Sequence, residues 1–190
     1  HVYPLPEFWQ ELDESTITIP HQPIRRDTWT YRNDQRRPLV EIFQGCRDMA
    51  IEQDVHEGLE QGHRVGFIAS SDHMSTSASY ACVWAEAPTR EAIFRALQAR
   101  RTYGATDRIW LAVRAGDHWM GEAIRATSVP PLSLRARGTA RFVEVTLMVD
   151  GRAHHTLRPN RPDLDLELEL DIESNHYAYF HLLQSDGNEA

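Results

Sequence analysis

Polar side chains that could bind a metal ion accompany three apolar runs in the first half of the chain. The run "TITIP" is followed by His21, "PLVEIF" contains Glu41, and "VGFIAS" precedes, after one more serine, the adjacent pair Asp72 and His73. If these runs are neighbouring parallel strands, their carboxyl ends would bring the four groups to one edge. Two imidazoles with one or two carboxylates form a suitable ligand set for zinc, manganese or iron. The serines around the pair would allow the bend that turns both side chains toward one ion.

A structural explanation of the same residues stays open. A histidine after a proline is commonly a loop residue, Glu41 could be a solvated strand position, and Asp72 could cap a local turn. The sequence has no short-range ligand motif such as H-x-x-x-H. It also lacks the G-x-S-x-G context that Ser70 or Ser71 would need as a nucleophile, and it has no glycine-rich phosphate loop.

Arginines are the candidate substrate-binding groups. Guanidinium groups bind phosphate and carboxylate bidentately, and most of these arginines lie in the polar loop that follows His21. Arg47 is the residue that we expect to offset charge on the substrate. His56 and His63, on or beside a predicted helix, are expected to be surface residues. The arginines of this group are Arg25, Arg26, Arg32, Arg36, Arg37 and Arg47.

Alternating strand and helix signals in residues 1–110 would position these groups. Strands are predicted at "TITIP", "PLVEIF", "RVGFIAS" and "ACVWAEA", and helices at "PEFWQELDE", "MAIEQDVHEGLEQG" and "PTREAIFRALQARR". Gly62 is expected to end the second helix, and Thr89 lies at the start of the third. Strand followed by helix, repeated, predicts an α/β fold with a parallel sheet or barrel.

Residues 111–190 show a different, β-rich pattern. Asp150-Gly151 between two extended runs predicts a two-residue hairpin. "LDLELELDI" alternates leucine with acid, which predicts a half-buried strand with a negative outer face. We therefore expect two domains, an α/β portion in residues 1–110 and a small antiparallel β-sandwich-like region in residues 111–190.

Composition restricts the function classes. The 190 residues are 41% hydrophobic with a formal net charge of -8, so a nucleic-acid partner is not expected. The longest apolar runs are strand-sized, so no membrane partner is expected either. Two cysteines are too few for a disulfide framework, which favours reduced thiols and a cytoplasmic location.

The runs "TITIPHQP", "PLVEIFQGCRDM", "GHRVGFIASSDHMSTSASYACVWAEAPTREAIFRALQARRTYGATDRIWL" and "GDHWMGE" together resemble metallohydrolases of the PHP superfamily, named for polymerase and histidinol phosphatase. The resemblance is most specific over residues 62–110 and covers nearly the whole chain. It implies the carboxyl-terminal part of a distorted (β/α)7 barrel, followed by a β-sandwich appendix. It also implies divalent metal ions that activate water for attack on a phosphate ester.

By this resemblance His21, Asp72 and His73 are metal ligands, and Glu41 is a ligand or a group that orients one. The opening H-x-H motif of the superfamily is absent, and Ser77 stands where relatives often carry a histidine. We therefore expect a fragment, or a chain that another chain or a second copy completes, and little activity from these residues alone. The alternative function is a non-catalytic binding or association module, for instance one that contacts carbohydrate.

Overall fold

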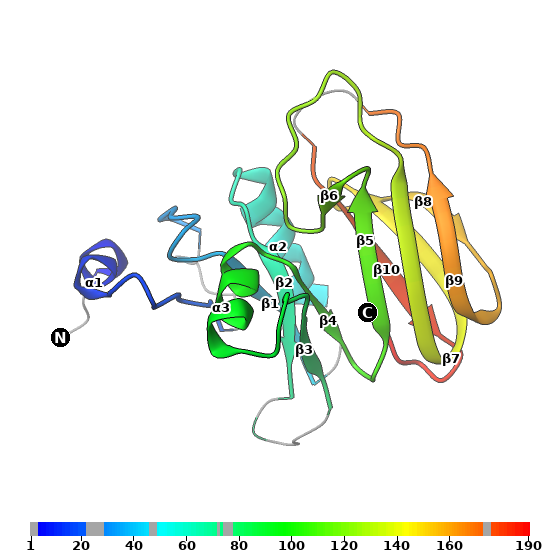
Figure 1. The fold of residues 1–190 in the computed structure, drawn as a ribbon, viewed down its shortest axis with the longest axis horizontal. Helices are drawn as coiled ribbons and strands as arrows, with labels where there is room; N and C mark the ends of the chain where they lie inside the picture. The colour runs from blue at the N-terminus through cyan, green and yellow to red at the C-terminus, as the bar shows by residue number, and fades with distance from the viewer. Residues whose placement is uncertain (1–3, 22–28, 46–48, 72, 74–77, 173–175) are drawn as a thin grey trace.

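The computed structural model describes residues 4–21, 29–45, 49–71, 73, 78–172 and 176–190. Within them, strands far outnumber helices, and the long carboxyl-terminal strands form the largest sheet (Figure 1). The elements are α1 (Leu5–Glu11), β1 (Leu39–Gln44), α2 (Met49–Glu60), β2 (Gly66–Ser70), β3 (Tyr80–Val83), α3 (Arg90–Gln98), β4 (Thr102–Ala105), β5 (Trp110–Ala115), β6 (His118–Trp119), β7 (Leu132–Val149), β8 (Arg152–Leu157), β9 (Arg161–Leu168) and β10 (Ala178–Gln184).

The first half is built on one parallel strand pair. β1 and β2 pair in parallel from Leu39 opposite Gly66 to Gln44 opposite Ser70, and α2 makes the connection between them. β3 and β4 form a separate antiparallel pair. β4 packs closely on β2, because a Cβ at Gly104 would lie only 2.9 Å from the Cβ of Ala69. The missing side chain at Gly104 therefore lets the two backbones approach.

The helix α2 covers β1 through a small apolar cluster. Ile51 and Val55 of the helix are buried with Val40 of the strand and with Trp29. The Trp29 ring lies directly against Gly58, where an added Cβ would be 2.4 Å from it. Gly62 takes a φ of +86° just after the helix, as predicted for its carboxyl-terminal stop.

His63 is part of this packing, so its prediction as a surface residue is wrong. It is 7% exposed, and its Nε2 lies 2.9 Å from the carbonyl oxygen of Trp29. A ring nitrogen facing a carbonyl must carry a proton, which fixes the Nε2–H tautomer as the donor. The charged form of the ring is disfavoured where it is buried, and burial is the main reason that the pKa of His63 is lowered.

The lowered pKa of His63 predicts a loss of stability in acid. The unfolded histidine titrates near about 6.5, so below that pH the unfolded state binds a proton that the folded state resists. We expect the free energy of unfolding to fall as the pH drops from 7.5 to 5.5. Urea denaturation at three pH values should show a shallower fall in His63→Gln than in the wild type. His155→Gln, at an exposed position of β8, should retain the wild-type slope.

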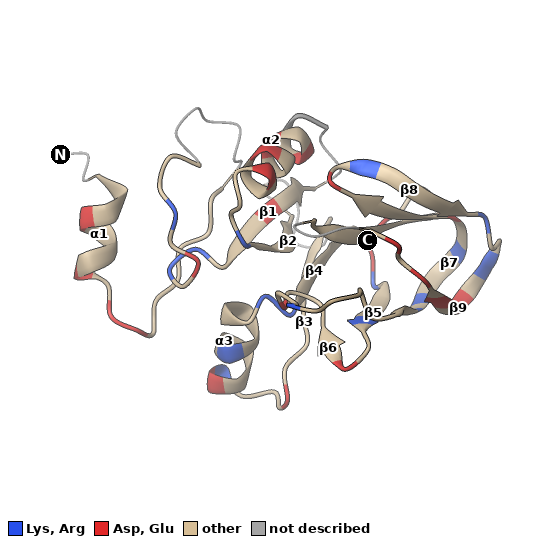
Figure 2. Ribbon diagram, turned by 90° about the horizontal axis from the view of Figure 1, so that it is seen from above, with Lys and Arg blue, Asp and Glu red and all other residues tan. Residues whose placement is uncertain are grey.

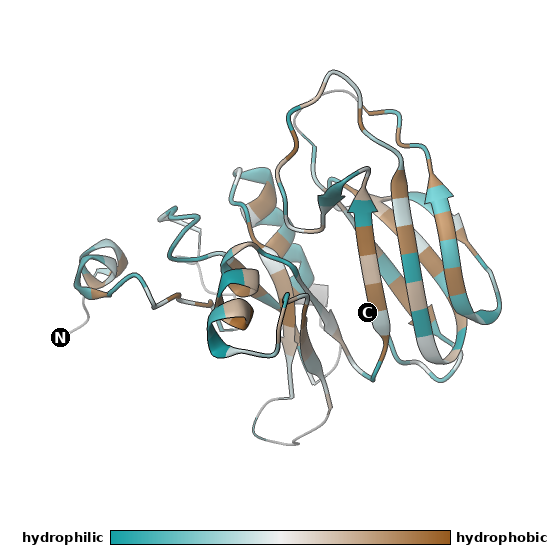
Figure 3. Ribbon diagram, in the orientation of Figure 1, coloured by the Kyte–Doolittle hydropathy of each residue, from teal (hydrophilic) through white to brown (hydrophobic). Residues whose placement is uncertain are grey.

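The second half is an antiparallel structure organised by β7. The amino-terminal part of this 18-residue strand pairs with β5 and β9, and its carboxyl-terminal part pairs with β8 and β10. The pairing with β9 shifts between Arg137 and Phe142, where the strand changes partners. Apolar side chains from both parts of β7 therefore meet in one core, and the brown bands along the sheet alternate with teal ones (Figure 3).

Two local predictions for this half are confirmed, the hairpin at Asp150-Gly151 and the alternating run that begins at Leu164. Asp150 and Gly151 both have positive φ, 47° and 70°, and Val149 pairs with Arg152, so the predicted hairpin is confirmed. Along β9, Leu164 is buried while Asp165 and Glu167 are exposed, which confirms the alternation.

Two aromatic side chains of the first half complete the open edge of β5. Tyr103 Oη accepts a hydrogen bond from the Leu111 backbone N–H (3.1 Å) and donates one to the carbonyl of Ile109 (2.9 Å). Trp84 Nε1 donates to the Leu111 carbonyl at 2.8 Å. These bonds satisfy backbone groups that a neighbouring strand would otherwise pair. They also join the two halves, and the buried position of Tyr103 raises the pKa of its hydroxyl.

A second polar contact joins α2 to β10. Tyr179 Oη donates to Glu52 at 3.2 Å and lies 2.6 Å from His56 Nε2. The side chain of His56 is 17% exposed, so its prediction as a surface residue is also wrong. The acidic residues of α2 appear as red bands on the ribbon in Figure 2, and one acidic residue of this helix, Glu52, takes part in the contact with β10.

The expected α/β fold, a part of a distorted (β/α)7 barrel, is wrong. The described strands form three separate sheets that do not close, and most of their residues belong to antiparallel pairs. One strand–helix–strand unit, β1–α2–β2, is parallel, but α3 connects the antiparallel strands β3 and β4. The predicted strand at 16–20 is extended chain without a strand assignment, tied by the Thr18 N–H to the Arg36 carbonyl at 2.6 Å. The sequence pattern placed β1, α2, β2 and α3, but it did not show which strands pair or in which direction.

Candidate functional site

A buried carboxylate lies within the parallel strand pair β1–β2. Glu41 sits in the middle of β1 and is 5% exposed, so a solvated position for this side chain is wrong. Its Oε2 lies 3.0 Å from Nδ1 of His21. Its Oε1 accepts a hydrogen bond from the Ser70 hydroxyl at the end of β2. A buried carboxylate is costly unless bonded in this way, and here both of its oxygens are engaged.

These contacts orient His21 toward solvent. With Nδ1 facing a carboxylate oxygen, the ring carries its proton there, and the lone pair of the neutral ring is on Nε2. The His21 side chain is 67% exposed, whereas that of Glu41 is 6% exposed. The carboxylate fixes the tautomer and the direction of the ring, which is how protein carboxylates hold metal-binding histidines.

The segment that carries Asp72 and His73 begins beside this pair. The Ser71 hydroxyl donates to the Ser79 carbonyl at 2.9 Å and accepts from the Ser79 N–H at 3.0 Å, so these two serines, before and after the segment, are bonded to each other. His73 is exposed. Asp72 lies outside the described residues, as does Arg47, so their predicted roles stay predictions.

The described residues alone contain no complete metal site. Among them, no group of three or more histidine, cysteine, aspartate or glutamate side chains is arranged to hold an ion. What they do contain is one imidazole held by a buried carboxylate, a donor arrangement that suits zinc or manganese. A fit to a divalent ion would therefore rest on the His21–Glu41 pair and would need further ligands, for which Asp72 and His73 are the residues predicted from the sequence.

Sequence reasoning assigned no role to Ser70 beyond that of a poor nucleophile. In the structure it donates to Glu41 from the adjacent strand, 29 positions away. The sequence did single out Glu41, as the one acid inside the apolar run "LVEIF". A carboxylate in a buried strand needs hydrogen-bond partners. Here they are His21 and Ser70, which are distant from Glu41 in the sequence.

The arginine group has structural roles where it is described. Arg32 makes two bonds to Asp34, from Nε and from a terminal nitrogen, each 3.0 Å long. Arg36 donates to the carbonyl of Leu12, just after α1. Arg25 and Arg26 lie outside the described residues.

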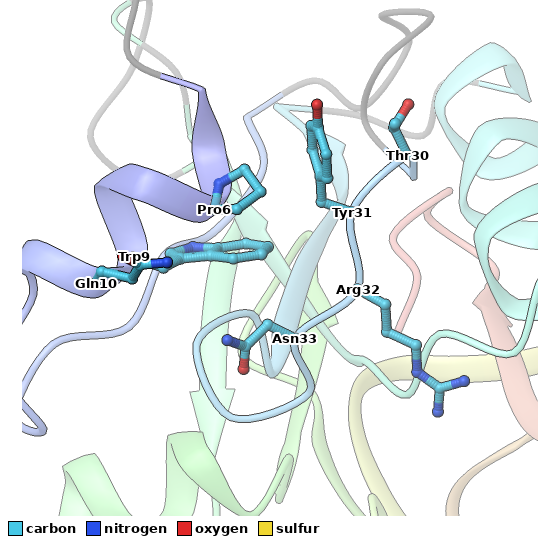
Figure 4. Close-up of a pocket in the computed structure, with 7 residues that line it drawn as sticks. All are labelled: Pro6, Trp9, Gln10, Thr30, Tyr31, Arg32 and Asn33. Carbon is cyan, nitrogen blue, oxygen red and sulfur yellow. The ribbon is translucent and has the colours of Figure 1, made fainter.

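A cavity of about 390 Å³ opens between α1 and residues 30–33 (Figure 4). Trp9 and Tyr31 flank it, while the guanidinium group of Arg32 points away from Trp9. Trp9 Nε1 is already bonded to the Thr18 hydroxyl at 3.0 Å. The cavity is separate from the Glu41 pair and contributes no group to it.

A second cavity of about 390 Å³ lies where α2 meets the β7–β8 turn. Glu60, Asp150, Arg152 and His154 are among the residues that line it. Burial, together with the charges of Glu60 and Asp150, raises the pKa of the nearby Tyr177 to about 12. The phenol therefore stays protonated at neutral pH. Its ring lies near that of His56 in α2, at the junction between the two halves.

The fold and the site define a β-rich chain in which a buried carboxylate within a short parallel sheet is paired with a histidine. The chain belongs to a family described as "Protein of unknown function (DUF3604)", whose model matches residues 41–136. The match begins at Glu41 and runs through β1–α2–β2 into β7, so it includes both halves of the molecule. No curated protein and no solved structure matches the chain. Within the described part, no helix has the length and apolar character needed to cross a bilayer.

Proposed function

We propose that this chain provides the metal-binding edge of a metal-dependent hydrolase that acts on phosphate esters. One observation carries the proposal: the buried Glu41 holds His21 by Nδ1 and leaves Nε2 free toward solvent. A surface histidine alone would have no such support. The carboxylate is bonded in turn by Ser70, so residues of both parallel strands fix the orientation of one ring.

Each residue has a role in this proposal. His21 through Nε2, Asp72 and His73 are the ligands, and Glu41 orients His21. Three protein ligands leave a coordination position open, as catalytic rather than structural sites do. A bound zinc, manganese or iron ion would supply Lewis acidity and lower the pKa of water toward about 7.

The proposed substrate is a small phosphate ester, which Arg47 would bind through its guanidinium group. The resemblance to the PHP superfamily supports this class of reaction, although the described strands do not form the barrel that it implies. The family match gives no activity, so the proposal depends on the residues themselves.

Metal binding by the purified chain tests the proposal directly. Equilibrium dialysis followed by elemental analysis should find about one zinc or manganese ion per chain, and His21→Ala should weaken binding by more than about tenfold. His155→Ala, which removes an exposed histidine of β8, is the matched control and should bind as the wild type does. Calorimetry should also show inorganic phosphate binding that requires the metal. A folded chain that binds no metal, or equal binding in His21→Ala, would refute the proposal.

The second candidate function is a non-catalytic binding or association module. It is favoured by the absence, within the described residues, of a group of three metal-binding side chains. A metal-free but stably folded protein with a specific ligand elsewhere would support this alternative.

A further inference from the structure

Three tryptophans from different elements meet beside β5. Trp84 follows β3, Trp110 begins β5, and Trp119 ends β6. The ring centroids of Trp84 and Trp110 are 5.3 Å apart, with the planes at 79°. Those of Trp84 and Trp119 are also 5.3 Å apart, at 39°. Both separations fall in the range of favourable aromatic contact.

Two of the three rings are fixed by their own partners. Trp84 is anchored by its Nε1 bond to the Leu111 carbonyl. The guanidinium carbon of Arg114 lies 4.2 Å from the centroid of Trp119, a cation–π contact. Trp110, which is packed against Trp84, remains 45% exposed, more than any other large hydrophobic side chain described. The cluster therefore presents one open indole on a rigid support, and a ligand that stacks on it would immobilise little.

Hydrogen-bonding groups continue from Trp110 across the sheet. Trp110 lies opposite Arg137 of β7, and Arg137 lies opposite Asp163 of β9. Residues directly opposite one another project from the same face of a sheet. Arg137 Nε donates to Asp163 at 2.8 Å, and both side chains are largely exposed. We call Trp110, Arg137 and Asp163, with the supporting Trp84 and Trp119, the tryptophan face.

A parallel row repeats the charge pairing. Arg135 of β7 bonds Asp165 of β9 at 3.3 Å, and both are exposed. The two cations and two anions of these rows cancel, so this surface carries donors and acceptors without a net charge. That balance is unsuitable for a polyanion, whose binding needs a basic surface. The chain as a whole carries a net charge of -8, which opposes a nucleic acid further.

We propose that the tryptophan face binds a neutral saccharide. The apolar C–H face of a pyranose ring would stack on Trp110, as aromatic side chains provide a large rigid contact area. Neighbouring hydroxyl groups of the sugar both donate and accept, and the guanidinium of Arg137 with the carboxylate of Asp163 supplies the complementary groups. Apolar contact with a few placed polar groups is the usual composition of a small-ligand site.

This site shares no residue with the His21–Glu41 pair. A protein that binds no saccharide could still bind a metal ion at His21, and a variant that has lost metal binding should still bind the saccharide. The two proposals can therefore be separated by one set of variants.

Affinity electrophoresis in native gels is the first test. Gels would contain hydroxyethylcellulose, xyloglucan, galactomannan or laminarin as neutral probes, and polygalacturonate or single-stranded DNA as anionic ones. The wild type should be retarded by at least one neutral polysaccharide. Calorimetry with an oligosaccharide of that polymer would then give the affinity.

Substitutions locate the binding. Trp110→Ala should weaken the affinity by about tenfold or more, as loss of a central tryptophan commonly does, and Trp110→Tyr should restore part of it. Asp163→Asn should weaken it less. Tyr31→Ala removes another exposed aromatic side chain, 41% exposed, and should bind as the wild type does. Circular dichroism would verify that each variant is folded.

Three outcomes would overturn the proposal. They are retardation of the wild type by none of the neutral polysaccharides, retardation only by the anionic probes, and undiminished affinity in a folded Trp110→Ala protein.

Discussion

Replacing Glu41 by glutamine is expected to weaken the binding of a zinc ion by about 10–100-fold. Glutamine keeps the size of the side chain and can still accept from Nδ1 of His21, but it removes the negative charge that raises the basicity of the ring. Competition against a chromogenic zinc chelator would measure the change. Because Glu41 is buried, thermal unfolding of the variant should be followed in parallel.

The chain contains a close match for this pair that serves as the control. His118 Nδ1 lies 3.0 Å from Oε2 of Glu122, the same atoms and distance as in the His21–Glu41 pair. The side chain of Glu122 is 34% exposed, against 6% for Glu41, and the bond from His118 lowers the pKa of its carboxyl. Glu122→Gln should leave metal binding unchanged. Equal affinities in Glu41→Gln and the wild type would show that Glu41 does not support a ligand.

Phe142→Ala is expected to lower the free energy of unfolding by about 3–5 kcal/mol. Phe142 is fully buried in the core of the β-rich half, at the point where β7 changes its strand partners. Removing the ring leaves a cavity. The parts of β7 on either side of Phe142 are held by their own strand partners, so they cannot move in to fill it. Urea denaturation at pH 7.5 would measure the loss.

The control for this substitution is another phenylalanine. Phe8 of α1 is 42% exposed, so Phe8→Ala should change the free energy of unfolding by less than about 0.5 kcal/mol. A loss below about 1 kcal/mol in Phe142→Ala would mean that the core around β7 is loosely packed.

The sequence could not show which strands pair with one another or in which direction. The pattern correctly placed strands at β1 and β2 and a helix between them, and that unit is parallel. The predicted strand "ACVWAEA" and helix "PTREAIFRALQARR" follow in the same order, yet β4, the strand after that helix, is antiparallel to β3. Apolar periodicity reports which face of an element is buried, whereas strand direction depends on the path of the connecting chain.

The candidate site shows the same division. The residue types of His21 and Glu41, one directly after an apolar run and the other inside one, were enough to select them. Their contact at 3.0 Å joins positions 20 apart, and the bond from Ser70 joins positions 29 apart. The burial of Glu41, which decides between an orienting carboxylate and a solvated one, depends on that packing.

The sequence by itself determined the features whose causes are local. Thr89 begins α3 by accepting from the Ala92 N–H, the Asp150-Gly151 turn closes a hairpin, and leucines alternate with acids along β9. These features follow from the chemistry of residues close together in the sequence, which does not depend on the rest of the fold. Only the tertiary structure decided which strands pair, that Glu41 supports His21, and that Trp84 and Trp119 gather around Trp110. Those contacts join residues far apart in the chain, and they form only when whole elements pack against one another.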